Sequence, residues 1–345
     1  MPSVNYNRRA LIAALVGAAV CLFFQRISFF SLFFLVPLGV VSFSYDYRVA
    51  WFSFFMAAVG NVFLSASSVI TAGTPIQGAL WDILFFIVIA SMFGWVTAPP
   101  PGFSRKVSGA VRLIAGSCIV ALLFTAIFFR TIATQPFSDY INSWIDTLLS
   151  MYRSANSDAV QNAVLESLTT DVIIKTMKSV MLRGGSLVSI ILLFFVCRQI
   201  SLAFSSLSRR LRGLSFPRTG TLAAFHVYPV VIWIFSGSLF LVVLSRIIKL
   251  EIPEIILWNI LILCVIMYLA QGFGILQFFL TKPSMHPSLR FLSFIVLFVL
   301  IFSPVLNVVF FAGIFLLGIA ENWASFRASK NNGPPSTPGA GDIRN

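Results

Sequence analysis

The sequence has few charged side chains, and acidic ones are the scarcer. Only 10% of its 345 residues are Asp, Glu, Lys or Arg, whereas 58% are hydrophobic. A soluble domain carries about 25% charged and 45–50% apolar residues. Because a globule in water must cover its interior with polar surface, this composition excludes an ordinary soluble protein. It predicts a chain that lies in lipid.

Residues that perform chemistry are also sparse. His226 and His286 are the only histidines, and no P-loop or His-Glu-x-x-His motif occurs. Ser236, Ser238 and His226 fall in one predicted helix, whereas an intramembrane serine protease needs Ser and His on facing helices. Each of the four cysteines lies in its own apolar run: Cys21, Cys118, Cys197 and Cys264. We therefore predict no enzymatic activity, no cofactor and no metal site.

Long apolar runs fill most of the chain. They cover residues 10–24, 27–44, 49–70, 76–98, 107–129, 184–204, 226–248, 255–280 and 291–320. About 20 apolar residues cross the ~30 Å hydrocarbon core as a helix, so the runs predict an all-α bundle of about eight to ten transmembrane helices. The first run resembles a signal peptide, but we interpret it as a retained helix. The last run contains Pro304, which predicts either one kinked helix or two short ones.

The positive charges lie mainly in the gaps between apolar runs. The net charge is +13, and most Lys and Arg fall on the side that includes Arg8 and Arg9 if the helices alternate. This bias predicts a cytoplasmic N-terminus in a bacterial inner membrane. The cations then face membrane lipids, and we expect no nucleic-acid partner.

A polar segment of residues 130–183 separates two apolar blocks. Tyr140, Trp144 and Met151 recur there at helical spacing. The pattern predicts extracytoplasmic amphipathic helices that lie either on the membrane surface or as a cap on the protein. The predicted organisation is a five-helix block (1–129), this loop (130–183), a block of three or four helices (184–327) and a disordered tail (328–345).

The C-terminal block carries a family resemblance. Its signature residues are Asn259, Gln271, Gly272, Gly318, Trp323, Phe326 and Arg327. In this order they resemble the YybS-like family of bacterial membrane proteins, whose function is unknown. The chain has Glu321 where that family has Asp, and Ala324-Ser325 where it has Phe-Asp.

The N-terminal block carries a looser resemblance. Ala10, Ala14 and Ala18 line one face of the first helix, and Pro37-Leu38-Gly39 follows. This arrangement resembles the substrate-binding S-component of energy-coupling factor (ECF) transporters. The resemblance implies an unknown small-molecule ligand, a coupling subunit that docks on the alanine face, and partner ATPases that drive uptake. Small residues at this spacing are also typical of packing between helices of one chain, which is the more common case, and both readings stay open.

Polar side chains at membrane depth are the candidate sites. Asp82 is the one acid inside a predicted span, and Gln77 precedes it. A carboxylate in lipid is costly, so Asp82 contacts either a ligand or an interfacial partner. Buried amides also need partners. The amides at this depth are Asn61, Asn259, Gln271, Gln277 and Asn307.

Two functions fit these features. A small-solute transporter needs a polar outward pocket that reaches Asp82, with Gln77 and Gln271 as further candidate ligand contacts. A membrane scaffold or assembly factor instead needs a packed interior whose polar groups pair with one another.

Overall fold

The computed structural model describes residues 4–27, 30–72, 76–102, 109–155, 169–211, 223, 225–248, 251–280, 286–303, 306–324 and 326–327. The described residues form helices and turns without strands, which confirms the predicted all-α bundle. The chain divides into two compact units, residues 1–217 and 218–345. The sequence-based boundary at 183/184 differs because the helix that follows it packs inside the first unit.

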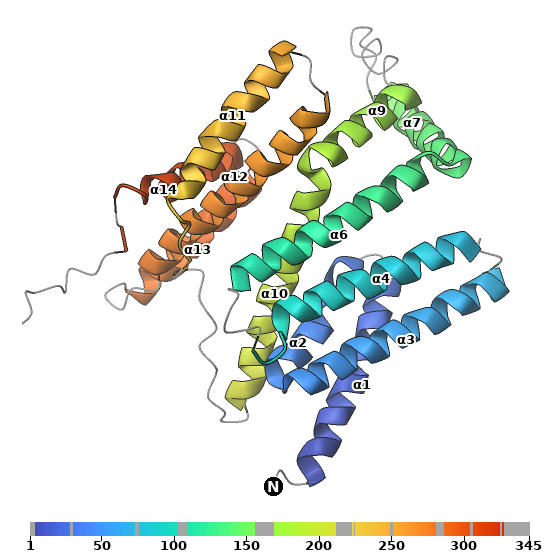
Figure 1. The fold of residues 1–345 in the computed structure, drawn as a ribbon. Helices are drawn as coiled ribbons and strands as arrows, with labels where there is room; N and C mark the ends of the chain where they lie inside the picture. Colours follow the sequence, from blue (N-terminus) through green and yellow to red (C-terminus); the bar gives the residue numbers. More distant parts are fainter. Residues whose placement is uncertain are drawn as a thin grey trace, which may run out of the picture. The chain divides into compact units, whose positions relative to one another are not determined.

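Unit 1 contains most of the long helices (Figure 1). They are α1 (Val4–Arg26), α2 (Val36–Ser44), α3 (Tyr47–Ala72), α4 (Ile76–Thr97), α6 (Gly109–Ile132), α7 (Gln135–Ala155), α9 (Thr170–Val180) and α10 (Ser186–Leu211). The short α2 packs against α1, α3, α4 and α10, while α6 packs against α4 and α10. The core around α2 is aromatic, and the ring centroids of Phe93 and Phe194 lie 5.4 Å apart.

The run 27–44 does not form a single spanning helix. It forms a 3-10 turn, η1 (Ser31–Phe33), and then α2, because Pro37 favours the start of a new helix. The nine residues of α2 extend about 14 Å at 1.5 Å per residue, which is too short to cross a membrane.

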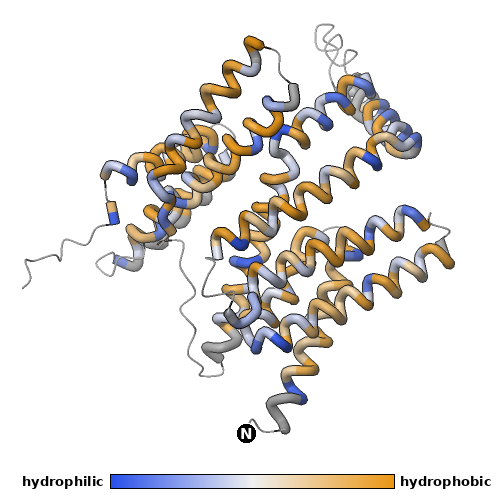
Figure 2. Tube along the Cα trace, viewed as in Figure 1, coloured by the Kyte–Doolittle hydropathy of each residue, from blue (hydrophilic) through white to orange (hydrophobic). Residues whose placement is uncertain are grey.

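The polar segment is helical where it is described, since it contains α7 and α9. Its hydrophilic residues gather along α7, in contrast to the apolar helices around it (Figure 2). A π-helical turn, η2 (Met181–Gly185), joins α9 to α10. Gly184 adopts φ 110° at this kink, a conformation that glycine enters without steric penalty.

Unit 2 contains α11 (Val230–Ile248), α12 (Glu251–Leu280), α13 (Pro287–Phe302) and α14 (Leu306–Ala320). Helix α12 packs between α11 and α14. The run 291–320 is broken, since α13 and α14 differ in direction by 109°; Pro304 itself lies outside the described residues.

Six helices in the described part of the chain are long and apolar enough to cross a membrane, or seven if α13 and α14 make one broken span. This number is lower than the eight to ten predicted, because the 27–44 and 226–248 runs give shorter apolar helices and the last run is bent. The chain is a multi-pass membrane protein.

Candidate functional site

In unit 2, Gln271 ties three segments together. It lies on α12 and is completely buried. Its Oε1 accepts a hydrogen bond from the backbone N–H of Val227, in the extended segment before α11. Its Nε2 donates to the carbonyl of Gly318 on α14 over 2.8 Å. The amide therefore satisfies buried backbone groups on both sides of its own helix.

Two glycines allow α12 and α14 to cross closely. A Cβ at Gly272 would lie 2.0 Å from the carbonyl oxygen of Ile314, and one at Gly318 would lie 2.0 Å from that of Tyr268. Real Cβ atoms do not approach that closely, so only glycine fits either position. Small residues let helix backbones gain dispersion contacts in lipid, where no hydrophobic drive joins them.

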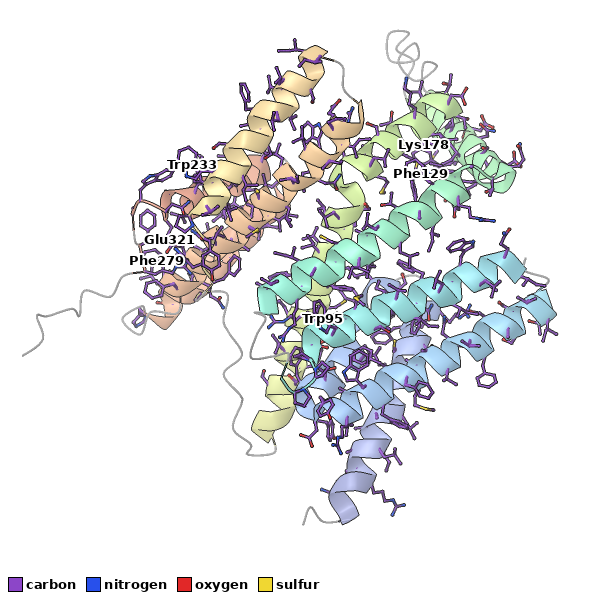
Figure 3. All side chains as sticks on the ribbon, viewed as in Figure 1. Trp95, Phe129, Lys178, Trp233, Phe279 and Glu321 are labelled. Atoms are coloured by element: carbon purple, nitrogen blue, oxygen red, sulfur yellow. The ribbon has the colours of Figure 1, made fainter. Side chains whose placement is uncertain are left out.

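A buried ion pair closes the end of α14. Glu321 has a side chain only 4% exposed, and its carboxylate binds the guanidinium of Arg327 through both Nε and Nη2. Arg327 also donates from Nη1 to the carbonyl of Ala223 over 2.6 Å. His226 Nδ1 lies 4.0 Å from Glu321, but its side chain is exposed. The labelled Glu321 in Figure 3 lies at this position, just after α14.

The remaining signature residues are peripheral. Asn259 donates to the carbonyl of Ile255 one turn earlier on α12. Trp323 and Phe326 are exposed. Gln277, outside the signature, accepts from the N–H of Ala223. The structure thus brings Gln271, Gly272, Gly318 and Arg327 into one region of unit 2 and leaves the two aromatic residues at its surface.

In unit 1, a polar stripe runs between α3 and α4. The Ser65 hydroxyl donates to Asp82 Oδ2 over 3.0 Å. Asp82 itself is exposed, as is Gln77, and Ser65 is buried. Asn61 lies one turn deeper than Ser65 on the same face of α3. The stripe therefore leads from an exposed carboxylate to a buried amide.

Asn61 does not meet the expectation that a buried amide has a partner. Its residue is fully buried, and neither Nδ2 nor Oδ1 has a hydrogen-bond partner among the described residues. The buried Oε1 of Gln25 on α1 is also unpaired there. Leu22 faces Gly60, which places Gln25 about one turn further along α1, near the level of Asn61.

The alanine face of α1 is buried within unit 1. Ala10, Ala14 and Ala18 are 3%, 0% and 4% exposed. The Ser53 hydroxyl of α3 donates to the carbonyl of Ala14 over 2.8 Å. A Cβ at Gly17 would lie 2.6 Å from Val41 of α2. The small residues thus serve packing inside this unit, and the face is covered in this structure.

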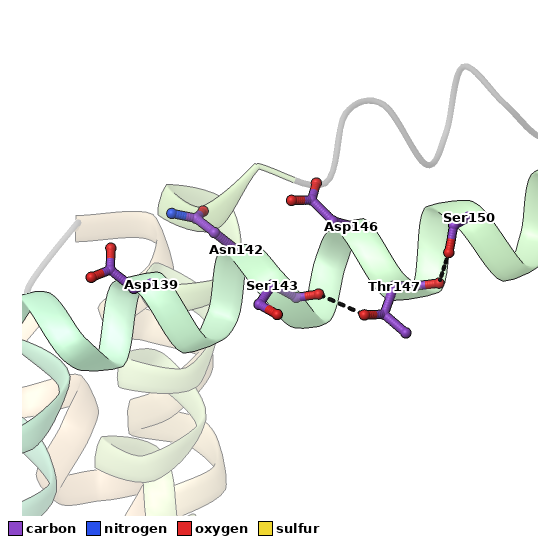
Figure 4. A pocket seen from close by; sticks show the side chains of 6 residues that line it. All are labelled: Asp139, Asn142, Ser143, Asp146, Thr147 and Ser150. Atoms are coloured by element: carbon purple, nitrogen blue, oxygen red, sulfur yellow. Dashed lines mark hydrogen bonds between the residues drawn. The ribbon is translucent and has the colours of Figure 1, made fainter.

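A polar depression of about 540 Å³ lies on α7 (Figure 4). Its lining residues are Asp139, Asn142, Ser143, Asp146, Thr147 and Ser150. Thr147 and Ser150 donate their hydroxyl hydrogens to carbonyls of their own helix. All six residues come from one helix and the depression is open, so it does not enclose a ligand. It includes neither Asp82 nor Gln77, so it is not the outward pocket that a transporter would need.

The described residues contain no group of three or more His, Cys, Asp or Glu side chains that could hold a metal ion. The four cysteines are free thiols. Sequence reasoning missed Gln25, Ser65 and the unpaired state of Asn61. The four-residue spacing of Asn61 and Ser65 could have predicted this polar stripe, because it places both side chains on one face of the helix.

Comparison with known families gives one result. No curated protein and no solved structure matches the chain. The model of a family described as predicted membrane proteins (DUF2232) matches residues 10–315. That range includes most of both units, from the alanine face of α1 to Ile314 on α14, and it ends before Gly318. The chain belongs to the DUF2232 family of predicted membrane proteins.

Proposed function

We propose that the protein binds a small polar solute within unit 1 and serves as the substrate-binding part of an uptake system. The resemblance of the Pro37-Leu38-Gly39 segment to ECF S-components supports this class, and the coupling subunit must dock elsewhere than on the alanine face of α1, which α3 covers in this structure. The proposal includes no chemical step, and energy for uptake comes from a coupling subunit and ATPases. In this proposal the protein lies in a bacterial inner membrane with its N-terminus in the cytoplasm, as the charge bias predicts.

The observation that carries the proposal is the unpaired amide of Asn61. A buried amide has two donor and two acceptor sites. A buried polar group that has no hydrogen-bond partner destabilises the fold by about 1–3 kcal/mol. Proteins therefore rarely retain such a group unless it has a function. A bound solute with both donors and acceptors would form hydrogen bonds with Asn61, and removing the penalty of the unpaired amide would strengthen binding.

The rest of the stripe indicates the character of the solute. Asp82 offers a carboxylate at the exposed end, and Ser65 links it to the buried end over 3.0 Å. The Gln25 carbonyl oxygen adds an unpaired acceptor near the level of Asn61. Acceptors therefore outnumber donors along the stripe, which favours a neutral or cationic solute rich in N–H or O–H groups.

A second candidate function rests on unit 2. There Gln271 forms hydrogen bonds with backbone groups of unit 2, and Glu321 forms an ion pair with Arg327. Internally paired polar groups are what we expect of a scaffold or assembly factor. This reading assigns unit 2 a structural role, and it is compatible with solute binding in unit 1.

The test is recovery of the solute. Wild-type protein purified from native membranes is extracted, and its small molecules are identified by mass spectrometry. We expect a polar compound that is depleted in Asn61→Leu and Ser65→Ala but retained in Ser67→Ala. Ser67 is a matched control, since it is exposed on α3 and its hydroxyl bonds only to its own helix.

Equal recovery from Asn61→Leu and Ser67→Ala would refute the site. Recovery of proteins alone, without a depleted compound, would favour the scaffold. Thermal midpoints measured in the same detergent show whether each variant is folded.

A further inference from the structure

Two arginines of unit 1 lie at the same level on neighbouring helices. Arg112 is in the first turn of α6, and Arg198 is on α10. The Thr125 hydroxyl donates to Ser186 over 2.8 Å, which fixes the register of the two helices. Arg112 precedes Thr125 about as far as Arg198 follows Ser186. Because α6 and α10 pack against each other, this register places both side chains at one level of the helix pair.

Neither arginine has an acidic partner in the described part of the chain. The Nε and Nη1 atoms of Arg112 are buried and have no hydrogen-bond acceptor. The Cζ of Arg198 lies 6.0 Å from the centroid of the Phe43 ring, on α2. The ion pairs that the structure describes lie elsewhere, at Glu321 in unit 2.

Simple snorkelling does not account for this arrangement. A snorkelling arginine extends its nitrogens to water or headgroups while its carbon stem stays in the apolar region. Arg112 is half-buried, and its Nε and Nη1 are buried without a hydrogen-bond partner, so these two nitrogens gain no such contact. Two like charges side by side also repel, and the repulsion is stronger away from water.

An oxyanion between the two groups would turn this repulsion into attraction. Guanidinium nitrogens form a planar fork that matches phosphate oxygens and binds them in pairs. A Cβ added at Gly109 would lie 3.7 Å from Nη2 of Arg112, which is an ordinary van der Waals distance. The first turn of α6 therefore leaves room around that nitrogen. The Phe43 ring supports Arg198 from its own side.

We propose that Arg112 and Arg198 form a binding site for a phosphate group. The group belongs either to an anionic phospholipid or to a phosphate in solution, because both present the same oxygens. The site lies on α6 and α10, whereas the proposed solute stripe lies on α3 and α4. It therefore stands or falls independently of solute uptake.

The experiment measures anion binding by the full-length protein in detergent. Dioleoyl phosphatidylglycerol, dioleoyl phosphatidylcholine and inorganic phosphate are titrated separately, with native mass spectrometry and the thermal midpoint as readouts. We expect saturable binding of phosphatidylglycerol, of inorganic phosphate or of both, with a raised midpoint. Phosphatidylcholine should have a smaller effect, since its headgroup is zwitterionic.

Arg112→Gln and Arg198→Gln should each weaken this binding about tenfold or more, because each removes charge-assisted hydrogen bonds. Arg48→Gln is the control, since Arg48 is exposed at the start of α3. A response to phosphatidylglycerol alone identifies a lipid site, and a response to inorganic phosphate alone identifies a soluble ligand.

Two outcomes would overturn the proposal. One is wild-type protein that binds neither phosphate probe, or that responds equally to phosphatidylglycerol and phosphatidylcholine with no response to inorganic phosphate. The other is binding that Arg48→Gln weakens as much as the two test variants do. The wild-type titrations decide the first outcome even if a variant fails to fold.

Discussion

The two units differ in how they treat buried polar side chains. In unit 2, Gln271, Glu321 and Arg327 bond to groups of the same unit, and the buried Oδ1 of Asn322 is an exception. In unit 1, buried atoms of Asn61, Gln25 and Arg112 lack partners among the described residues. Since pairing is the normal state of a buried polar group, this difference supports the proposal that unit 1 binds a solute while the polar groups of unit 2 serve packing.

A substitution at Gly272, where α12 and α14 cross, should have the largest effect on stability. It tests whether unit 2 depends on close packing. Gly272→Ala places a Cβ 2.0 Å from the carbonyl oxygen of Ile314, and backbone cannot yield as a side chain can. We expect a loss of about 3 kcal/mol or more, seen as reduced folded yield and a lower thermal midpoint.

Gly313→Ala is the matched control, because a Cβ at Gly313 on α14 meets nothing within 4 Å. A Gly272→Ala protein as stable as Gly313→Ala would show that the two helices do not cross as described.

Breaking the buried ion pair has the next largest effect. Glu321→Gln leaves the Arg327 guanidinium, 13% exposed, without its counter-charge. Removing one partner of a buried pair costs about 3 kcal/mol, measurable by urea unfolding in detergent. The double variant Glu321→Gln/Arg327→Gln should recover part of that loss. Asp139→Asn on α7, exposed, should change little. A stable Glu321→Gln protein would contradict a packing role for this pair.

Substitutions on the two faces of α1 test whether the alanine face is needed for packing within unit 1. Ala14 is fully buried against α3, whereas Val16 on the opposite face is 54% exposed. Ala14→Leu should lower stability by about 2 kcal/mol through overpacking, and Val16→Leu should not. Thermal midpoints of the two purified variants make the comparison. Equal midpoints would mean that the small residues are not needed for packing.

Much of the fold followed from the sequence because apolar length and helical spacing are local properties. Residues 76–98 and 255–280 gave α4 and α12 nearly as predicted. Residues 27–44 did not, since Pro37 begins a new helix inside an apolar run whose length alone suggests one span. Hydropathy cannot register such a break.

The sites were less predictable, because pairing depends on neighbours that are distant in sequence. Gln271 and Gly272 were recognisable as a polar residue beside a small one, but Gly318 as their partner required the fold. The reverse held for Asn61, for which a partner was expected and none is described. The sequence singled out Gln271 through its signature and its neighbouring glycine, but whether either amide has a partner became known only from the structure.

The most direct test compares these two amides by the thermal midpoints of Asn61→Leu and Gln271→Leu. Gln271→Leu leaves the Val227 N–H without its partner, so we expect a loss of about 2 kcal/mol. Asn61→Leu removes an amide that has no described partner, so the fold should be as stable as wild type or more stable, while solute recovery is lost. A destabilised Asn61→Leu beside an unaffected Gln271→Leu would contradict the assignment of binding to unit 1 and packing to unit 2.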